Sequence, residues 1–196
     1  MGTTPAFASV SEAIDTARAA LGYLAAADAA QLADATLAEA LRGLEQTDAI
    51  ATAARAYFLA AFTAGQGYAA DADYSPRAWL IHKTRISKGA AVARTAWARR
   101  AGAHPAVVAA LAGGGLSESC GRTICQWTDR LPGDCREAAD AILLSAAAAG
   151  MDLPDLAGLA AEIYERSRSD LPDEDPAREF ADRGVRLVTT FQAPVS

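Results

Sequence analysis

Alanine occupies 51 of the 196 positions of this chain, about a quarter of the sequence. Alanine has the highest helix propensity of all residues, and its small side chain lets neighbouring helices approach closely. Aromatic residues, which are common in strands, make up only 7% of the chain. The sequence therefore predicts an all-α fold built from closely packed helices.

Length and composition are compatible with one globular domain, because 52% of the 196 residues are apolar. No run of 18 consecutive apolar residues is present, so a membrane-spanning helix is not expected. Residues 1–10 lack the basic and apolar regions of a secretory signal. The three cysteines are spaced C-x4-C-x9-C, which fits neither a disulfide framework nor a usual zinc site. We expect a cytoplasmic protein with reduced thiols, no bound metal and no cofactor.

The first part of the chain predicts two long helices. Ser11 precedes an alanine-rich stretch, which predicts a helix over 11–27 with acidic residues in its first turn. Leucine, alanine and phenylalanine then recur at helical spacing over 35–64, up to Gly65. A helix of this length needs a packing partner, and the first helix is the expected one.

The middle of the chain predicts several short helices between residues 75 and 131. Ser75 followed by Pro76 is a strong helix start, and Ser87 and Ser117 are further N-cap candidates. Two longer helices are expected over 133–149 and 154–167. Together, residues 1–168 are predicted to form one multi-helix bundle with a long N-terminal helix pair.

Residues 169–196 differ from the rest in composition. An acidic, proline-containing linker leads to an alternating segment, Val185 to Thr190, which is the one credible strand. A strand without a second strand to pair with suggests either that the chain is truncated at this end or that the strand adds to another molecule.

Charge is distributed unevenly along the chain, although the net charge is only −6. Residues 1–75 have a balance of −6, residues 76–136 hold ten basic and three acidic residues, and residues 137–196 have a balance of −7. A basic segment with a balance of +7 thus lies between two acidic ones. The acidic total therefore does not exclude a nucleic-acid partner.

Two interpretations of the basic segment remain open. Its charges either pair with the acidic flanks or form a surface that binds DNA or RNA phosphates. The candidate nucleic-acid-binding residues are Arg77, Lys83, Arg85, Lys88, Arg94, Arg99, Arg100 and Arg122.

The segment from Trp79 to Ala98 also has the rhythm of a helix-turn-helix motif, with a turn at Arg85 and Ile86 and a capping Ser87. Two positions depart from the usual scheme. Arg85 replaces the usual turn glycine, and Ile81 replaces the usual small residue. Paired helices of this kind also occur in proteins that do not bind DNA.

No catalytic constellation is recognisable in the sequence. Neither histidine, His82 or His104, lies in a metal-binding or triad pattern, and each is expected to be a surface or hydrogen-bonded residue. The chain contains no phosphate-binding P-loop and no nucleophile elbow. We therefore expect that this chain is not an enzyme, and no small-molecule substrate is identified.

Several short motifs, taken in order, resemble the helical domain of unknown function 222, also called the 13E12 repeat family of high-GC bacteria. The resemblance extends from about Leu32 to Phe191 and rests on Ser75-Pro76-x-Ala78-Trp79-Leu80, Thr84-Arg85-Ile86-Ser87-x-x-Ala90-Ala91, Ala98-Arg99, Pro105, Leu111-x-x-x-Gly115-Leu116-Ser117, Leu131-Pro132 and Asp182-Arg183-x-Val185-Arg186-Leu187. Members of this family carry the helical region before a C-terminal HNH endonuclease domain.

This resemblance implies a DNA-related setting. No catalytic residues carry over, because no position of this chain matches the HNH motif. The leading hypothesis is a non-catalytic, DNA-associated helical module that uses the basic segment 76–136. The alternative is a protein–protein interaction domain that uses the long N-terminal helices for dimerisation or for docking a partner helix.

Overall fold

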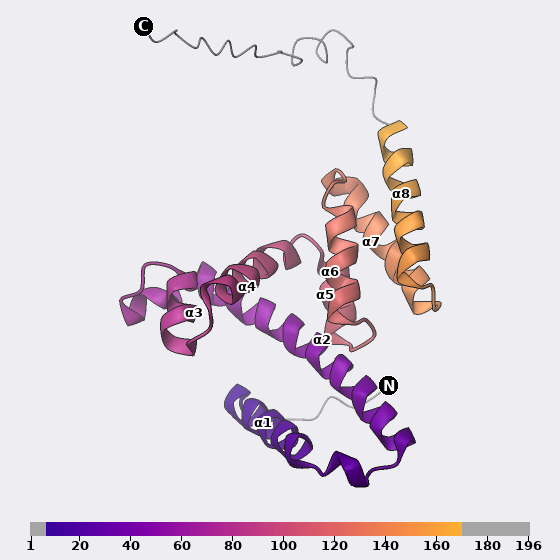
Figure 1. The fold of residues 1–196 in the computed structure, drawn as a ribbon. Coiled ribbons are helices and arrows are strands. Elements are labelled where there is room, and N and C mark those ends of the chain that lie inside the picture. Colours follow the sequence, from indigo (N-terminus) through magenta and orange to yellow (C-terminus); the bar gives the residue numbers. More distant parts are fainter. Residues whose placement is uncertain (1–6, 170–196) are drawn as a thin grey trace, which may run out of the picture. The chain divides into compact units, whose positions relative to one another are not determined.

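The structure is a computed structural model that describes residues 7–169, and these residues form an all-α fold, as predicted (Figure 1). The helices are α1 (Val10–Ala26), α2 (Asp34–Ala64), α3 (Pro76–Thr84), α4 (Lys88–Ala101), α5 (Pro105–Ala112), α6 (Glu118–Thr128), α7 (Gly133–Ala148) and α8 (Leu153–Ser169), with short 3-10 helices η1 (Ala29–Gln31) and η2 (Gly67–Asp71). The predicted C-terminal strand and most of the acidic linker lie outside the described residues. Within the described range, no helix is both long enough and apolar enough to cross a membrane.

Serine side chains cap four of these helices at their N-termini. Ser75, Ser87 and Ser117 accept hydrogen bonds from backbone amides three residues later, at 3.1 to 3.3 Å, as their sequence context predicts. The first helix differs from the prediction, because Ser9 is its cap and Ser11 lies within its first turn. Each such cap contributes about 1 kcal/mol to helix stability.

The chain divides into two compact units at Glu45 and Gln46, within α2. The first unit contains α1, η1 and the beginning of α2. No residue of α1 is buried, and the buried residues of α2 all lie between Ala49 and Leu59. The two long helices are thus present as predicted, and the packing of α1 along α2 stays a prediction.

The second unit holds the hydrophobic core. Side chains of α2, α4, α5, α6, α7 and α8 form its main cluster, which includes the fully buried Leu111, Ile124 and Leu143. Alanines of α2 line this cluster at one-turn spacing, with Ala49 and Ala53 almost completely buried. A larger side chain at either position would have to displace its neighbours in this cluster.

A second, smaller cluster holds the basic part of the chain together. Leu59 of α2, Leu80 of α3 and Ala91 and Ala98 of α4 are buried against one another. The half-buried Phe62, Trp79, Ile81 and Ile86 pack around them. This cluster fixes α3 and α4 against the C-terminal half of α2.

The turn between α3 and α4 contains three residues, Arg85 to Ser87. Arg85 adopts a left-handed backbone conformation with φ 55°, and its amide donates a hydrogen bond to the Ile81 carbonyl at 3.1 Å. Glycine is the residue that usually closes a helix in this conformation. The helix-turn-helix rhythm in the sequence thus corresponds to two packed helices joined by a tight turn.

Candidate nucleic-acid interface

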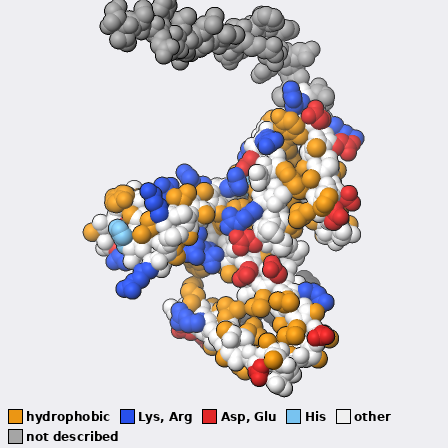
Figure 2. All heavy atoms as spheres, viewed as in Figure 1, with side chains coloured by type: hydrophobic (Ala, Val, Ile, Leu, Met, Phe, Trp, Pro, Cys, Tyr) orange, Lys and Arg blue, Asp and Glu red, His pale blue; other side chains and the backbone are white. Residues whose placement is uncertain are grey.

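Lysine and arginine side chains gather over α3 and α4 in the space-filling view (Figure 2). The eight basic residues predicted to bind nucleic acid come from α3, the turn after it, α4 and α6. A basic side chain that is already paired with an acidic one must give up that partner before it can bind phosphate. The first question is therefore which of the eight residues are paired.

Three of the eight residues are paired. Lys83 contacts Asp71 of η2 at 2.8 Å, and Arg100 contacts Asp129 at 2.8 Å. Arg122 bonds to Glu118 at 2.7 Å and also lies over the ring of Trp97, 4.5 Å from its centre. For these three residues, the interpretation that the basic charges pair with acids holds, although only Asp71 comes from an acidic flank.

The pKa values in these pairs shift in the direction that favours the charged forms. Hydrogen bonds from Lys83 and Trp79 lower the pKa of Asp71, and the bond to Asp71 raises the pKa of Lys83. Burial alone would raise the pKa of Glu118, but hydrogen bonds from Thr52 and Arg122 lower it overall.

The other five basic residues have no acidic partner within ion-pair distance in the described part of the chain. Four of them are exposed and Arg94 is half-buried. The five are Arg77, Arg85, Lys88, Arg94 and Arg99. Because they are unpaired, an external anion can approach these groups without displacing a carboxylate.

The helix geometry separates the three unpaired basic residues of α4. Lys88 and Arg99 are eleven residues apart, so they point within about 20° of each other and lie about 16 Å apart along the axis. Arg94 points about 120° away from Lys88, toward the side of the helix where Ala91 and Ala98 are buried. Lys88 and Arg99 therefore belong to one exposed face, and Arg94 does not share it.

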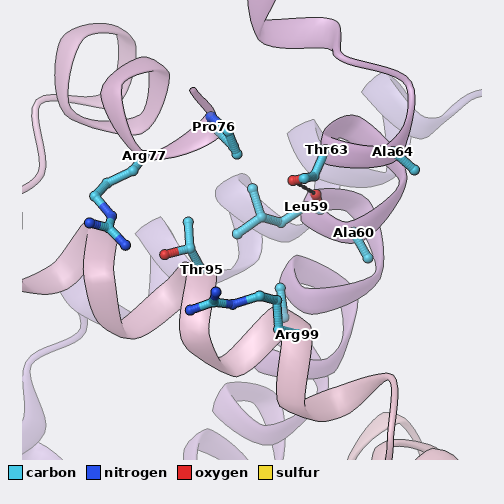
Figure 3. A pocket seen from close by; sticks show the side chains of 9 residues that line it. Leu59, Ala60, Thr63, Ala64, Pro76, Arg77, Thr95 and Arg99 are labelled. Carbon is cyan, nitrogen blue, oxygen red and sulfur yellow. Dashed lines mark hydrogen bonds between the residues drawn. The ribbon is translucent and has the colours of Figure 1, made fainter. Parts of the chain in front are cut away.

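Arg77 and Arg99 both line a cleft of about 460 Å³ between α2, α3 and α4 (Figure 3). The cleft is lined by Leu59, Ala60, Thr63, Ala64, Pro76, Arg77, Thr95, Ala98 and Arg99. The sequence did not predict this cleft. A loop joins α2 to α3, and no local sequence pattern specifies the path of that loop.

Acidic residues of η2 and the following turn neutralise another side of α3. The indole of Trp79 donates to Asp71 at 2.6 Å, and Nδ1 of His82 lies 2.7 Å from Asp73, which is buried. The positive surface of α3 is thus limited to residues that these carboxylates do not reach, Arg77 among them.

A buried polar network lies where α4, α5, α6 and α7 meet. His104 is fully buried, with Nδ1 2.7 Å from Asp140 and Nε2 2.9 Å from Asp129. Thr128 donates to Asp140 at 2.7 Å, and Arg100 contacts Asp129. Both ring nitrogens face carboxylate oxygens, an arrangement that is satisfied when both carry hydrogen. The expectation of a hydrogen-bonded histidine is confirmed, but its two aspartate partners were not foreseen.

The three cysteines are free thiols. Burial, followed by the nearby Asp140 and Asp129 charges, raises the pKa of Cys125 to about 12. Burial also raises the pKa of Cys120. In the described part of the chain, no three His, Cys, Asp or Glu side chains are grouped so that they could hold a metal ion.

Comparisons with protein-family models, curated proteins and solved structures found no match to this chain. The likeness to the 13E12 repeat family therefore stays a prediction that rests on the order and spacing of the motifs quoted above.

Proposed function

We propose that this chain is a non-catalytic helical module that binds the phosphate backbone of duplex DNA through α3, α4 and the turn between them. The observation that carries the proposal is the set of unpaired basic side chains on this segment: Arg77, Arg85, Lys88 and Arg99 are exposed and have no acidic partner among the described residues. The resemblance to a family whose members carry the helical region before an HNH endonuclease domain supports a DNA-related role.

The dimensions of α4 suit such a surface. Lys88 and Arg99 lie about 16 Å apart on one face of the helix, and the major groove of B-DNA is about 12 Å wide. The two side chains are long enough to reach phosphates on both sides of one groove. The other exposed positions of α4 include Gly89, Val92 and Ala96, which cannot form hydrogen bonds to bases through their side chains. We therefore propose binding with little sequence preference.

Charge-reversal variants test this proposal. The double variant Arg85→Glu/Lys88→Glu changes the charge by −4 on the proposed surface, and both residues are exposed. The double variant Arg18→Glu/Arg42→Glu makes the same change in the first unit and is the matched control. We expect fluorescence anisotropy with a labelled duplex at 50 mM salt to show at least a tenfold loss for the first variant and little change for the control. Equal losses in both variants would show that only net charge matters, and no binding by the natural chain would overturn the proposal.

A second candidate function, dimerisation, is favoured by exposed apolar residues in the first unit. Val10, Ile14, Leu21 and Leu24 form one stripe along α1, and each is exposed. Leu41 and Leu44 form an exposed stripe at the start of α2. Two apolar helices in each copy are the components of a four-helix arrangement between two copies.

Light scattering tests this second candidate. We expect a dimer that becomes a monomer in the variant Ile14→Glu/Leu21→Glu, and the variant Ala20→Glu/Tyr23→Glu, on other positions of α1, is the control. A natural chain that is monomeric at 100 μM, a concentration on the order of those at which weak dimers form, would refute the dimer.

A further inference from the structure

We propose that the cleft between α2, α3 and α4 is a binding site for a small organic carboxylate with an apolar body. Arg77 and Arg99 also belong to the proposed DNA surface, but the inference concerns a different ligand, and its test contains no DNA. It rests on three features of the cleft. Its floor is apolar, two of its lining residues are arginines without an acidic partner, and the hydroxyl groups of its two threonines already donate hydrogen bonds.

The volume and the floor of the cleft suit a small apolar molecule. A volume of about 460 Å³ falls within the range of about 300 to 1,000 Å³ that is usual for small-molecule sites. Side chains of Leu59, Ala60, Ala64 and Ala98 and the ring of Pro76 supply carbon atoms to the lining. Figure 3 shows the Leu59 side chain directed toward the middle of the cleft.

The guanidinium groups supply the charge. Figure 3 shows Arg77 of α3 and Arg99 of α4 on the same side of the cleft, with Thr95 between them. Neither arginine has an ion-pair partner among the described residues, and the lining contains no acidic side chain. Two guanidinium groups without a counter-charge favour an anion, and their planar donor groups match the geometry of a carboxylate.

The two threonines of the cleft do not compete with the arginines as donors. The Thr63 hydroxyl donates to the Leu59 carbonyl at 2.7 Å, and the Thr95 hydroxyl donates to the Ala91 carbonyl at 2.9 Å. Their hydrogens are therefore already used within the helices. The arginines supply the free hydrogen-bond donors among the lining side chains, so the polar group of a ligand must be an acceptor, and a charged one binds best.

The position of the charge relative to the floor sets the ligand class. The arginines lie at one side and the small side chains of α2 line the other (Figure 3). A molecule with one carboxylate and an aliphatic chain or aromatic ring satisfies both parts. A small ion such as acetate satisfies only the arginines, and a neutral alcohol fills the apolar floor but brings no negative charge to the arginines.

Isothermal titration calorimetry with octanoate tests this inference, with acetate and 1-octanol as matched controls. We expect saturable octanoate binding by the natural chain, at least tenfold tighter than either control, and at least tenfold weaker binding after Arg77→Gln or Arg99→Gln. The variant Arg42→Gln, outside the cleft, is expected to bind octanoate like the natural chain. Ala60→Phe, which fills the cleft from an exposed position of α2, is expected to abolish binding without removing a charge.

The inference would be overturned by octanoate that fails to saturate up to 1 mM, by octanol that binds as tightly as octanoate, or by unchanged binding in both arginine variants. Circular dichroism of each variant shows whether the helices are retained. The titration contains no DNA, so its outcome is separate from that of the anisotropy experiment.

Discussion

Arg85 carries out two tasks at the turn between α3 and α4. Its backbone adopts the left-handed conformation that ends α3, at φ 55°, and its exposed side chain is one of the unpaired cations of the proposed DNA surface. A residue with a Cβ atom is strained in this conformation by about 1 kcal/mol or more. Glycine would relieve the strain but would remove the charge, so the presence of arginine here is consistent with a role for the charge.

This interpretation predicts opposite effects of one substitution. Arg85→Gly should raise the free energy of unfolding by about 1 kcal/mol while lowering DNA affinity. Arg85→Ala removes the same charge but keeps the strain, so it should lower DNA affinity equally without the gain in stability. Urea denaturation and anisotropy measured on both variants check this, and a glycine variant no more stable than the alanine variant would contradict it.

His104 is the centre of a buried polar network in the second unit. It joins α5 to α6 through Asp129 and to α7 through Asp140, and it is completely buried. Removing one partner of a buried pair leaves an uncompensated charge in the interior, which costs about 3 to 5 kcal/mol.

We predict that His104→Ala lowers the free energy of unfolding by about 3 kcal/mol or more. The control Arg166→Ala breaks the exposed pair with Glu162 and should cost no more than about 1 kcal/mol. Chemical denaturation of both variants measures the difference. Similar small losses in both would show that the network contributes little to stability.

Glu118 makes the stability of the α2–α6 contact depend on pH. Its carboxylate accepts a hydrogen bond from Thr52 at 2.8 Å and bonds to Arg122, and its pKa is lower in the folded chain than the ordinary 4.5. The folded state therefore favours the ionised form. Its contribution to stability is present above the unfolded pKa and is lost as the pH falls through the folded pKa.

Glu118→Gln should therefore destabilise the chain at pH 7 and have a smaller effect at pH 3. The matched variant Glu137→Gln, at an exposed position of α7, should show no such dependence. Urea denaturation at the two pH values gives the comparison. An effect of Glu118→Gln that is the same at both would contradict the assigned role.

At the scale of helices, the sequence predicted where elements begin and end more completely than what they contact. Serine caps and the Ser75-Pro76 start depend on residues within one turn of each other, so local pattern is sufficient. The packing partner of α1 cannot be predicted in the same way. An apolar stripe predicts that a helix has a face to bury but does not say against what, and α1 leaves its stripe exposed in this chain.

The same reason explains what the sequence missed at the candidate site. The cleft needs Leu59 and Arg99 to meet, and the buried network needs His104 and Asp140 to meet, 36 residues apart. Such contacts come from packing of whole helices. The unpaired state of Arg77, Arg85, Lys88 and Arg99 is likewise a property of the packed structure, since the sequence shows only that acids and bases are both plentiful.

The burial of the α2 alanines gives a prediction at this scale. Ala53 is 2% exposed in the main core cluster, whereas its neighbour Ala54 is exposed. Ala53→Leu should force helices apart and cost about 1 to 3 kcal/mol. Ala54→Leu adds the same atoms in solvent and should have little effect. Thermal unfolding of both variants tests whether a small side chain is required at this buried position, and equal melting temperatures would contradict it.

For the whole molecule, net charge is a poor guide to binding. The total is −6, yet the segment 76–136 has a balance of +7. Four exposed cations on α3, α4 and the turn between them have no acidic partner among the described residues. At physiological salt, charges further apart than about 8 Å are largely screened from one another. A phosphate group at α3 and α4 therefore responds mainly to the basic residues near it.

The salt dependence of DNA binding tests the central claim most directly. If the four exposed cations each contact one phosphate, the logarithm of the association constant should fall with the logarithm of salt concentration with a slope of about −3.6. Affinity should then drop about a hundredfold between 50 and 200 mM salt, and Arg85→Glu/Lys88→Glu should halve the slope. A duplex affinity that does not change with salt, or no binding at 50 mM, would contradict the account.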